Sequence, residues 1–164
     1  MSNRANTIKL ITTGLLDEVS REAQASPRRR KNRNFHPADD FPSHRLLNAI
    51  EPGSYVAPHR HLDPSKDESM LVLRGRLGLV IFDDAGGILQ AVELTAGGAS
   101  LGVDISHGCW HSVLGLEPGT VFFEAKAGPY VALTSEERAL WAPQEGDAGA
   151  AGYLEKLRSL FACA

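Results

Sequence analysis

The 164-residue sequence has few cysteines, no long apolar run and little net charge. Each of these three features excludes or disfavours a class of protein. Its two cysteines, Cys109 and Cys163, do not make a disulfide framework, and this favours a reducing cytoplasm. No run of about 18 apolar residues occurs, so no membrane span is expected, and the polar start predicts no secretory signal. The 17 basic and 20 acidic side chains give a net charge of −3, which provides no overall reason to expect nucleic acid as a partner.

The rest of the composition is ordinary for one folded domain. The hydrophobic fraction of 43 % excludes a disordered chain, and no disulfide is needed to stabilise a core at this length. Short β-rich runs broken by Gly, Pro and Asp predict eight strands, over residues 44–50, 55–58, 69–74, 77–82, 88–94, 101–105, 112–116 and 120–126. Their nearly regular spacing predicts an all-β sandwich or small barrel of the jelly-roll type.

Helical periodicity flanks this β-rich region at both ends, over residues 15–24 and 153–161. We therefore expect three segments: a helix and basic arm over 1–38, a barrel over 39–132, and a linker and helix over 133–164. The run at 69–73 is apolar on both faces, so its outer face needs a cover, from the terminal helices or from a second copy.

Three histidines and one glutamate have the spacing of a metal site. Because alternate residues of an extended chain point the same way, His59 and His61 present two imidazoles to one side, while Arg60 faces the other. A turn after His61 returns Glu68 toward the same place, and His111 follows a glycine turn far downstream. Three imidazole nitrogens and one carboxylate suit a divalent transition metal, with iron, manganese, zinc and nickel among the candidates.

This pattern resembles the two motifs of the cupin superfamily. The first motif corresponds to Gly53-x5-His59-x-His61 with Glu68-x6-Gly75, and the core of the second to Gly108-x2-His111. The resemblance implies a double-stranded β-helix with flanking helices, in which His59, His61, Glu68 and His111 bind one metal ion per chain. It also implies a homodimer.

A closer resemblance is to the WbuC family of cupin-fold metalloproteins. It rests on the strings RNFH, HRLLNAIEPGSYVAPHRHLDPSKDE, LVLRGRLG and VFFEAKAGPY, and extends over most of residues 30–141. Members of that family often lie near bacterial surface-polysaccharide genes. The resemblance therefore implies a carbohydrate-related small molecule as substrate or ligand.

Two classes of function compete for such a site. In the first, the metal acts as a Lewis acid in an isomerase, an epimerase or an oxygen-dependent enzyme. In the second, the barrel is a non-catalytic sensor or binding protein, and a purely structural ion is a third interpretation. The sequence alone does not decide between them.

Several polar side chains are candidates for the rest of the site. Phe122, Glu124 and Lys126 share one strand face; the last two are an acid/base pair if that face points inward. We expect Lys126 to point outward or into an interface, and the direction of Glu124 is open. The candidates for substrate binding are Asn48, Tyr55, Lys66 and Arg74.

The other histidines, Cys109, Trp110 and the basic run are interpreted as having structural roles. His36, His44 and His107 lack ligand spacing, Cys109 is expected to fill space, and Trp110 is expected to pack on the face opposite His111. The basic run 28–33 is interpreted as a solvated arm before the domain, or as arginines that pair with carboxylates of a partner subunit. The alternative is that Arg28, Arg30 and Arg33 fold over the barrel mouth and bind an anionic substrate.

Overall fold

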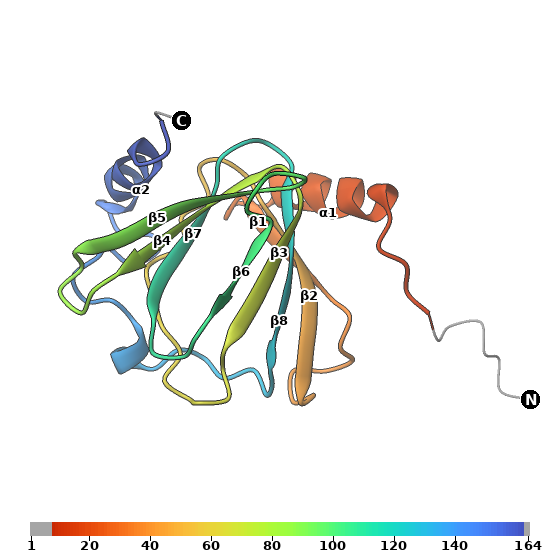
Figure 1. Cartoon of the computed structure of the whole chain (residues 1–164), viewed down its shortest axis with the longest axis horizontal. Helices are drawn as coiled ribbons and strands as arrows, with labels where there is room; N and C mark the ends of the chain where they lie inside the picture. The colour runs from red at the N-terminus through yellow and green to blue at the C-terminus, as the bar shows by residue number, and fades with distance from the viewer. Residues whose placement is uncertain (1–7, 163–164) are drawn as a thin grey trace, which may run out of the picture.

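The computed structural model describes residues 8–162, in which two antiparallel sheets face each other and each is covered by one helix (Figure 1). Cys163 lies outside the described residues. The first sheet has the strand order β1 (Arg30–Asn34), β2 (Ser43–Ile50), β8 (Thr120–Ala127), β3 (Glu68–Arg74) and β6 (Gly102–Ile105). The second has the order β5 (Ile88–Thr95), β4 (Arg76–Phe82) and β7 (Trp110–Gly115). The helices are α1 (Thr13–Ala25) and α2 (Ala150–Ser159), and a 3-10 turn spans Ser135–Glu137.

The main core lies between the two sheets because each strand alternates apolar residues toward its partner layer. Met70 and Phe122 of the first sheet pack with Leu77, Leu79 and Val113 of the second. These side chains fill one end of the space between the sheets. The candidate site lies beside this core, and Met70, Val113 and Phe122 also line its cavity.

The two helices cover the outer faces of the sheets. The apolar stripe of α1 places Val19 and Ala23 against Leu47 and Val121 on the first sheet. Leu157 of α2 belongs to a separate cluster on the outer side of the second sheet. Leu71 remains 44 % exposed on β3, so the apolar run at 69–73 is covered only in part. The homodimer stays a prediction.

The predicted fold class, all-β with a helix on either side of the barrel in the sequence, is confirmed by the two antiparallel sheets and the two helices. Seven of the eight expected strands correspond to β2–β8, and both expected helices are present with slightly different ends. The expected strand at 55–58 is wrong: this segment is extended but joins no sheet. The sequence also failed to predict β1, because its residues are nearly all charged or amide side chains with no apolar alternation.

The basic arm therefore forms an edge strand of the barrel. Arg30 pairs with Ile50 and Asn34 with Leu46 along the whole of β1. The expected boundary at residue 38 falls between these two paired strands, and the division into three segments stays a prediction. Within residues 8–162, the structure contains no helix of the length and apolarity needed to cross a bilayer.

Candidate metal centre

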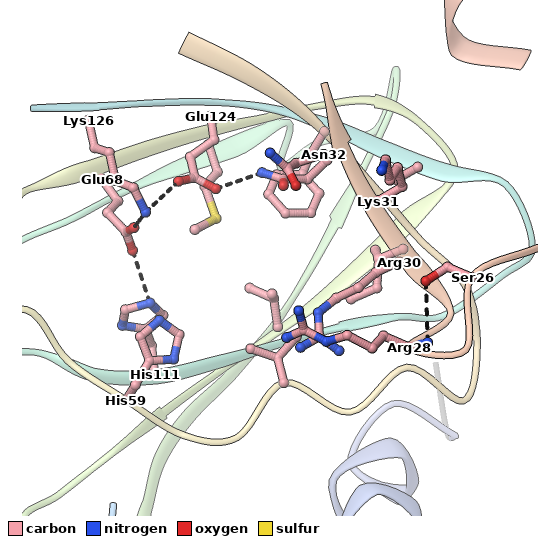
Figure 2. A pocket seen from close by; sticks show the side chains of 17 residues that line it. Ser26, Arg28, Arg30, Lys31, Asn32, His59, Glu68, His111, Glu124 and Lys126 are labelled. Carbon is pink, nitrogen blue, oxygen red and sulfur yellow. Dashed lines mark hydrogen bonds and ion pairs between the residues drawn. The ribbon is translucent and has the colours of Figure 1, made fainter. Parts of the chain in front are cut away.

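A cavity of about 370 Å³ opens between the two sheets, and three of the four predicted metal-binding residues lie at one end of it (Figure 2). His59, Glu68 and His111 line this end together with Glu124 and Lys126. The other end, toward β1, is lined by the basic run. The full lining is Ser26, Arg28, Arg30, Lys31, Asn32, Asn48, Ala49, Ile50, Val56, His59, Glu68, Met70, His111, Val113, Phe122, Glu124 and Lys126.

Three separate stretches of chain supply the candidate donors. Glu68 is the first residue of β3, on the five-stranded sheet, and His111 lies on β7, on the three-stranded sheet. His59 and His61 lie on the extended segment before β3. The backbone of His59 is fixed to that of His111 by two hydrogen bonds, 3.0 Å from His59 N to His111 O and 2.9 Å in the return direction.

Alternation along the extended segment turns the histidines inward and the arginine outward. The guanidinium of Arg60 lies 4.3 Å from the ring centroid of Trp110, a cation–π contact on the outer side of the three-stranded sheet. Trp110 is buried there, next to inward-pointing His111. The predicted orientations of Arg60 and Trp110 are therefore confirmed.

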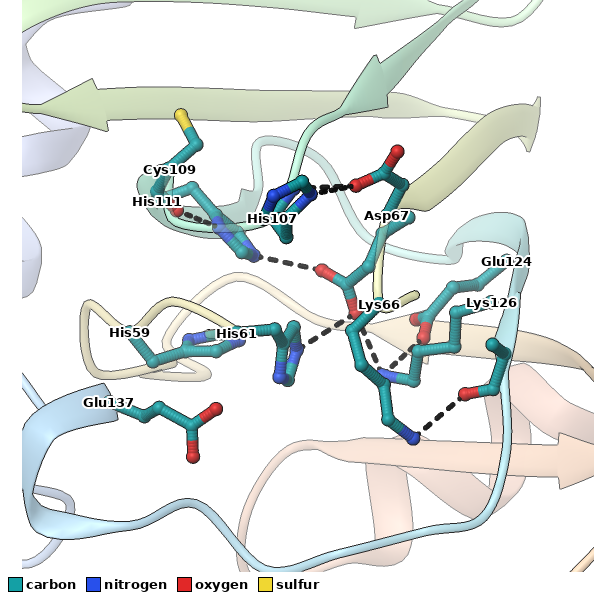
Figure 3. A network of polar contacts seen from close by, with 12 residues as sticks. His59, His61, Lys66, Asp67, His107, Cys109, His111, Glu124, Lys126 and Glu137 are labelled. Atoms are coloured by element: carbon teal, nitrogen blue, oxygen red, sulfur yellow. Dashed lines mark hydrogen bonds and ion pairs between the residues drawn. The ribbon is translucent and has the colours of Figure 1, made fainter. Parts of the chain in front are cut away.

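His61, His111 and Lys126, which are labelled in Figure 3, converge on the carboxylate of Glu68. Nε2 of His61 lies 3.2 Å from Glu68 Oε1, and Nε2 of His111 lies 3.0 Å from Glu68 Oε2. His59, His61 and Glu68 each have a donor atom within 4.8 Å of the other two, a set that can hold a metal ion. His111 is outside that set, although its ring centroid lies 4.5 Å from that of His59.

The hydrogen bonds of two rings fix which nitrogen faces the cluster. Nδ1 of His59 lies 3.0 Å from the carbonyl of Ala57, and Nδ1 of His111 lies 3.0 Å from that of Cys109. Because a carbonyl only accepts, Nδ1 of each ring carries the proton and donates it. In its neutral form, each ring with this hydrogen bond presents an Nε2 lone pair to the cluster, as metal ligands do.

Three buried atoms of the cluster have no hydrogen-bond partner among residues 8–162: Nε2 of His61, Nε2 of His111 and Oε2 of Glu68. Buried polar atoms are nearly always satisfied, and a lone pair placed 3.0 Å from a carboxylate oxygen is repelled. A cation between them would remove both costs. The residues therefore fit a bound metal ion.

The pKa values of His59 and Glu68 are both shifted clearly, and each shift favours the protonation state that can bind a metal ion. Burial of the His59 ring, with His111 adding to the effect, lowers the pKa of His59 to about 3. Burial by itself would raise the pKa of Glu68, but its surroundings outweigh burial and lower it, and the charge of the Lys126 ammonium at 2.7 Å contributes to this lowering. At neutral pH the cluster therefore holds a neutral His59 imidazole and a charged Glu68 carboxylate.

Lys126 points inward, and the expectation that it points outward is wrong. Its Nζ lies 2.7 Å from Glu68 Oε1 and 2.8 Å from Glu124 Oε1, since β8 is hydrogen-bonded to β3 and places both carboxylates within reach. Burial opposes its charge, but Glu124 and Glu68 outweigh burial and raise the pKa of Lys126. Glu124 also points inward, and Asn48 Nδ2 donates to its Oε2 over 2.6 Å.

Of the four candidates for substrate binding, only Asn48 lines the main cavity. Lys66 Nζ donates to the carbonyls of Ala127 and Pro129 and lines a second cavity of about 210 Å³, together with His59 and His61. The other two lie elsewhere. Tyr55 donates its hydroxyl to Pro143 O at 2.7 Å, and Arg74 pairs with Asp17 of α1 at 2.7 Å.

The residues given structural interpretations lie outside the donor set. His36 and His44 are buried and stack on each other with ring centroids 4.0 Å apart. His107 Nδ1 lies 2.8 Å from Asp67 Oδ1. Cys109 packs against the main core, as predicted, and burial raises the pKa of its thiol.

Two residues at the basic end of the cavity escaped sequence analysis. Asn32 has only amide chemistry and lies in a strand that was not expected. Glu145 pairs with Arg28 and Arg30 across more than a hundred residues, a separation at which sequence carries no pairing signal.

Comparison with known families places the chain in one of them. Residues 11–94 match the model of a family described as a domain of unknown function, DUF6016. The chain belongs to this family. The match extends from α1 through β5 and includes three of the four candidate ligands. No curated protein matches the chain.

The chain is also similar to solved structures at low sequence identity. A conserved protein of unknown function, SPY1581 from Streptococcus pyogenes, is 10 % identical with a TM-score of 0.51, over 79 % of this chain and 95 % of that one. KdgF from Halomonas sp. is 16 % identical with a TM-score of 0.48, over 62 % and 80 %. A cupin-2 domain protein from Shewanella frigidimarina is 19 % identical with a TM-score of 0.45, over 60 % and 80 %. At such identities the likeness concerns the fold alone, and the closer resemblance to WbuC proteins stays a prediction.

Proposed function

We propose that this protein binds one divalent transition metal ion through Nε2 of His59, His61 and His111 and the carboxylate of Glu68. The observation that carries the proposal is the set of buried, partnerless acceptor atoms in the cluster. Two of the rings are held by backbone carbonyls so that their lone pairs face Glu68. Iron, manganese, zinc or nickel suits this donor set.

We further propose that the site is an enzyme active site for a small polar, carbohydrate-related molecule. The cavity beside the cluster has about 370 Å³, within the range of small-molecule sites. A bound ion would supply Lewis-acid polarisation of a hydroxyl or carbonyl oxygen. The candidate chemistry is isomerisation or epimerisation, with oxygen-dependent cleavage as the alternative. A role in bacterial surface-polysaccharide metabolism, in the cytoplasm, is part of this proposal and rests on the resemblance to WbuC proteins.

Glu124 and Lys126 have different roles in this proposal. The raised pKa of Lys126 keeps it as an ammonium, which is unsuited to remove a proton. Its charge instead orients Glu68 and Glu124, to which it is 2.7 and 2.8 Å distant. Glu124 lines the cavity and is held on its other oxygen by Asn48. We therefore assign proton transfer to Glu124 and positioning to Lys126.

Elemental analysis tests the metal, and substrate panels test the reaction. Protein purified without an affinity-resin metal is expected to carry about one transition metal ion per chain. It is then incubated with sugars and sugar acids, with and without oxygen, and products are followed by mass spectrometry. Binding without turnover in either atmosphere would reject the enzyme and support the non-catalytic binding protein. Absence of any stoichiometric metal would reject the site itself.

A further inference from the structure

The cavity has two chemically different ends (Figure 2). At one end lie the imidazoles and carboxylates around Glu68. At the other end lie Arg28, Arg30 and Lys31, from the start of β1 and the turn before it. Both ends line one continuous cavity of about 370 Å³.

The two arginines form a fork that already binds a carboxylate. Arg28 donates from Nε to one oxygen of Glu145 at 2.7 Å and from Nη2 to the other at 2.8 Å. Arg30 donates from Nη2 to the second oxygen at 2.7 Å. Paired donors of this geometry are selective for planar acids. These hydrogen bonds lower the pKa of Glu145 to about 2, and the bonds from Arg28 have a larger effect than the bond from Arg30.

Arg30 is held in place by neighbours that do not involve Glu145. Its Nη1 donates to the carbonyl of Tyr55 at 3.0 Å and to Oγ of Ser54 at 3.3 Å, and its side chain is only 20 % exposed. A guanidinium anchored in this way keeps its direction when the carboxylate beside it is exchanged. Arg28, at 63 % exposure, is free to follow an incoming group.

Charge at this end favours a second anion. Arg28 and Arg30 carry two positive charges against one on Glu145, and Lys31 adds a third to the lining. The net positive charge is concentrated where the cavity meets solvent, since Arg28 and Lys31 are exposed. Such a mouth attracts acids and orients them with the charged group outward.

Polar side chains connect the two ends along the inner face of the five-stranded sheet. Asn32 of β1 pairs with Asn48 of β2, and Asn48 donates to Glu124 of β8. Amides and carboxylates in a row can hydrogen-bond successive hydroxyl groups of an extended molecule.

We propose that the Arg28–Arg30 fork binds the acidic group of an elongated, polyhydroxylated acid whose other end lies at the His59–Glu68–His111 cluster. The acid takes the place of the Glu145 carboxylate at the fork. The placement of its far end rests on the proposed metal site, whereas acid binding at the fork does not. Arg33, which was grouped with these residues, has no part in it, because it pairs with Glu18 and Glu22 of α1.

The test compares D-gluconate with sorbitol, which have the same chain of hydroxyl groups but differ in the carboxylate. Affinities are measured by calorimetry on the full chain, both metal-free and loaded with metal. Wild-type protein is expected to prefer gluconate by about tenfold or more, the usual value of hydrogen bonds to a charged group. Arg28→Gln and Arg30→Gln are each expected to remove most of this preference.

Glu145→Gln separates competition from a simple structural tie. If Glu145 competes with the acid, the variant binds gluconate severalfold more tightly than wild type, while sorbitol binding does not change. If Glu145 only ties the C-terminal segment to β1, the variant melts at lower temperature with unchanged gluconate affinity, and the proposal is wrong. Arg76→Gln is the matched control for the two arginine variants. Arg76 also makes two hydrogen bonds to one carboxylate, that of Glu93, but on the other sheet.

Two outcomes distinguish this inference from the metal proposal. Stoichiometric metal binding with equal affinity for gluconate and sorbitol would overturn the fork and leave the metal site intact. Gluconate preference in protein that binds no metal would support the fork and reject the metal site. Circular dichroism confirms that each variant is folded, and Arg28→Gln, at an exposed position, gives an answer even if Arg30→Gln does not fold.

Discussion

Lys126 and Glu68 stand directly opposite each other on β8 and β3, and Nζ of the lysine lies 2.7 Å from Oε1 of the glutamate. The carboxylate of Glu68 therefore has the Lys126 cation and Nε2 of His61 near one oxygen and Nε2 of His111 near the other. One oxygen is held by the lysine, which leaves the other to face Nε2 of His111. This division gives the carboxylate a fixed direction, which a metal ligand requires.

Replacing both histidines of the extended segment is expected to abolish metal binding without unfolding the protein. The His59→Ala/His61→Ala variant loses two of four donors, while the main core between the sheets does not involve them. Metal content by elemental analysis should fall from about one ion per chain to background, with an unchanged far-ultraviolet circular dichroism spectrum. His107→Ala is the control, because His107 pairs with Asp67 and should keep the metal. Full metal content in the double variant would contradict the assignment.

The stability of the metal-free protein should fall as pH is lowered from about 6.5 toward 3. The pKa of His59 is about 3 in the folded chain against 6.5 for an unperturbed histidine, so the unfolded chain binds the extra proton in this window. Stability from this group is fully present above pH 6.5 and decreases by about 2 kcal/mol at pH 5. Urea unfolding across this range measures it.

His59→Gln is the control for this pH dependence, because glutamine does not titrate. The variant should lose less stability than wild type between pH 7 and pH 5. Parallel curves for the two proteins would show that the ring of His59 is not protected from protonation in the folded state.

Removing the partly buried cation of Lys126, which lies between two buried carboxylates, is expected to destabilise the fold more than removing an exposed cation. Lys126→Met leaves Glu68 and Glu124 with no compensating charge between them. Breaking a buried pair in this way costs about 3 kcal/mol or more. Lys156→Met, on the surface of α2, should change the free energy of unfolding by less than about 0.5 kcal/mol. Urea unfolding at pH 7 compares the two, and equal small losses would mean that the carboxylates are solvated.

Two glycines with the same backbone conformation should respond differently to alanine. Gly75 has φ +78° and Gly97 has φ +73°, so both substitutions meet the left-handed strain of about 1 kcal/mol. A methyl group at Gly75 would lie 2.9 Å from the backbone of Thr120, whereas nothing lies within 4 Å at Gly97. Gly75→Ala should therefore cost about 1 to 3 kcal/mol more than Gly97→Ala in chemical unfolding. Equal costs would contradict the crowding at Gly75.

Local patterns in the sequence predicted most of the barrel. Alternation of apolar residues indicated the strands, and the two-residue spacing of His59 and His61 predicted that both rings face one side. These features depend only on neighbouring residues. A short β-rich run also occurs at residues 55–58, although this segment does not join a sheet.

Features that depend on distant partners escaped prediction. Lys126 points inward because it pairs with a carboxylate from β3 and with one from its own strand. The alternation of residues along β8 shows which side chains share a face but not which face points inward. β1 lacks an apolar face and is held mainly by backbone pairing with β2. Arg74 appeared suited to a substrate, but α1 places Asp17 beside it on the outer surface.

The paired backbone hydrogen bonds between His59 and His111 have a consequence for how tightly an ion is held. Residues that are far apart in the chain are brought together as the polypeptide folds, so the conformational entropy of closing that long loop is lost then. Only side-chain rotations remain to be restricted on coordination. A metal site whose ligands are brought together in this way should bind its ion more tightly than one that is assembled around the ion.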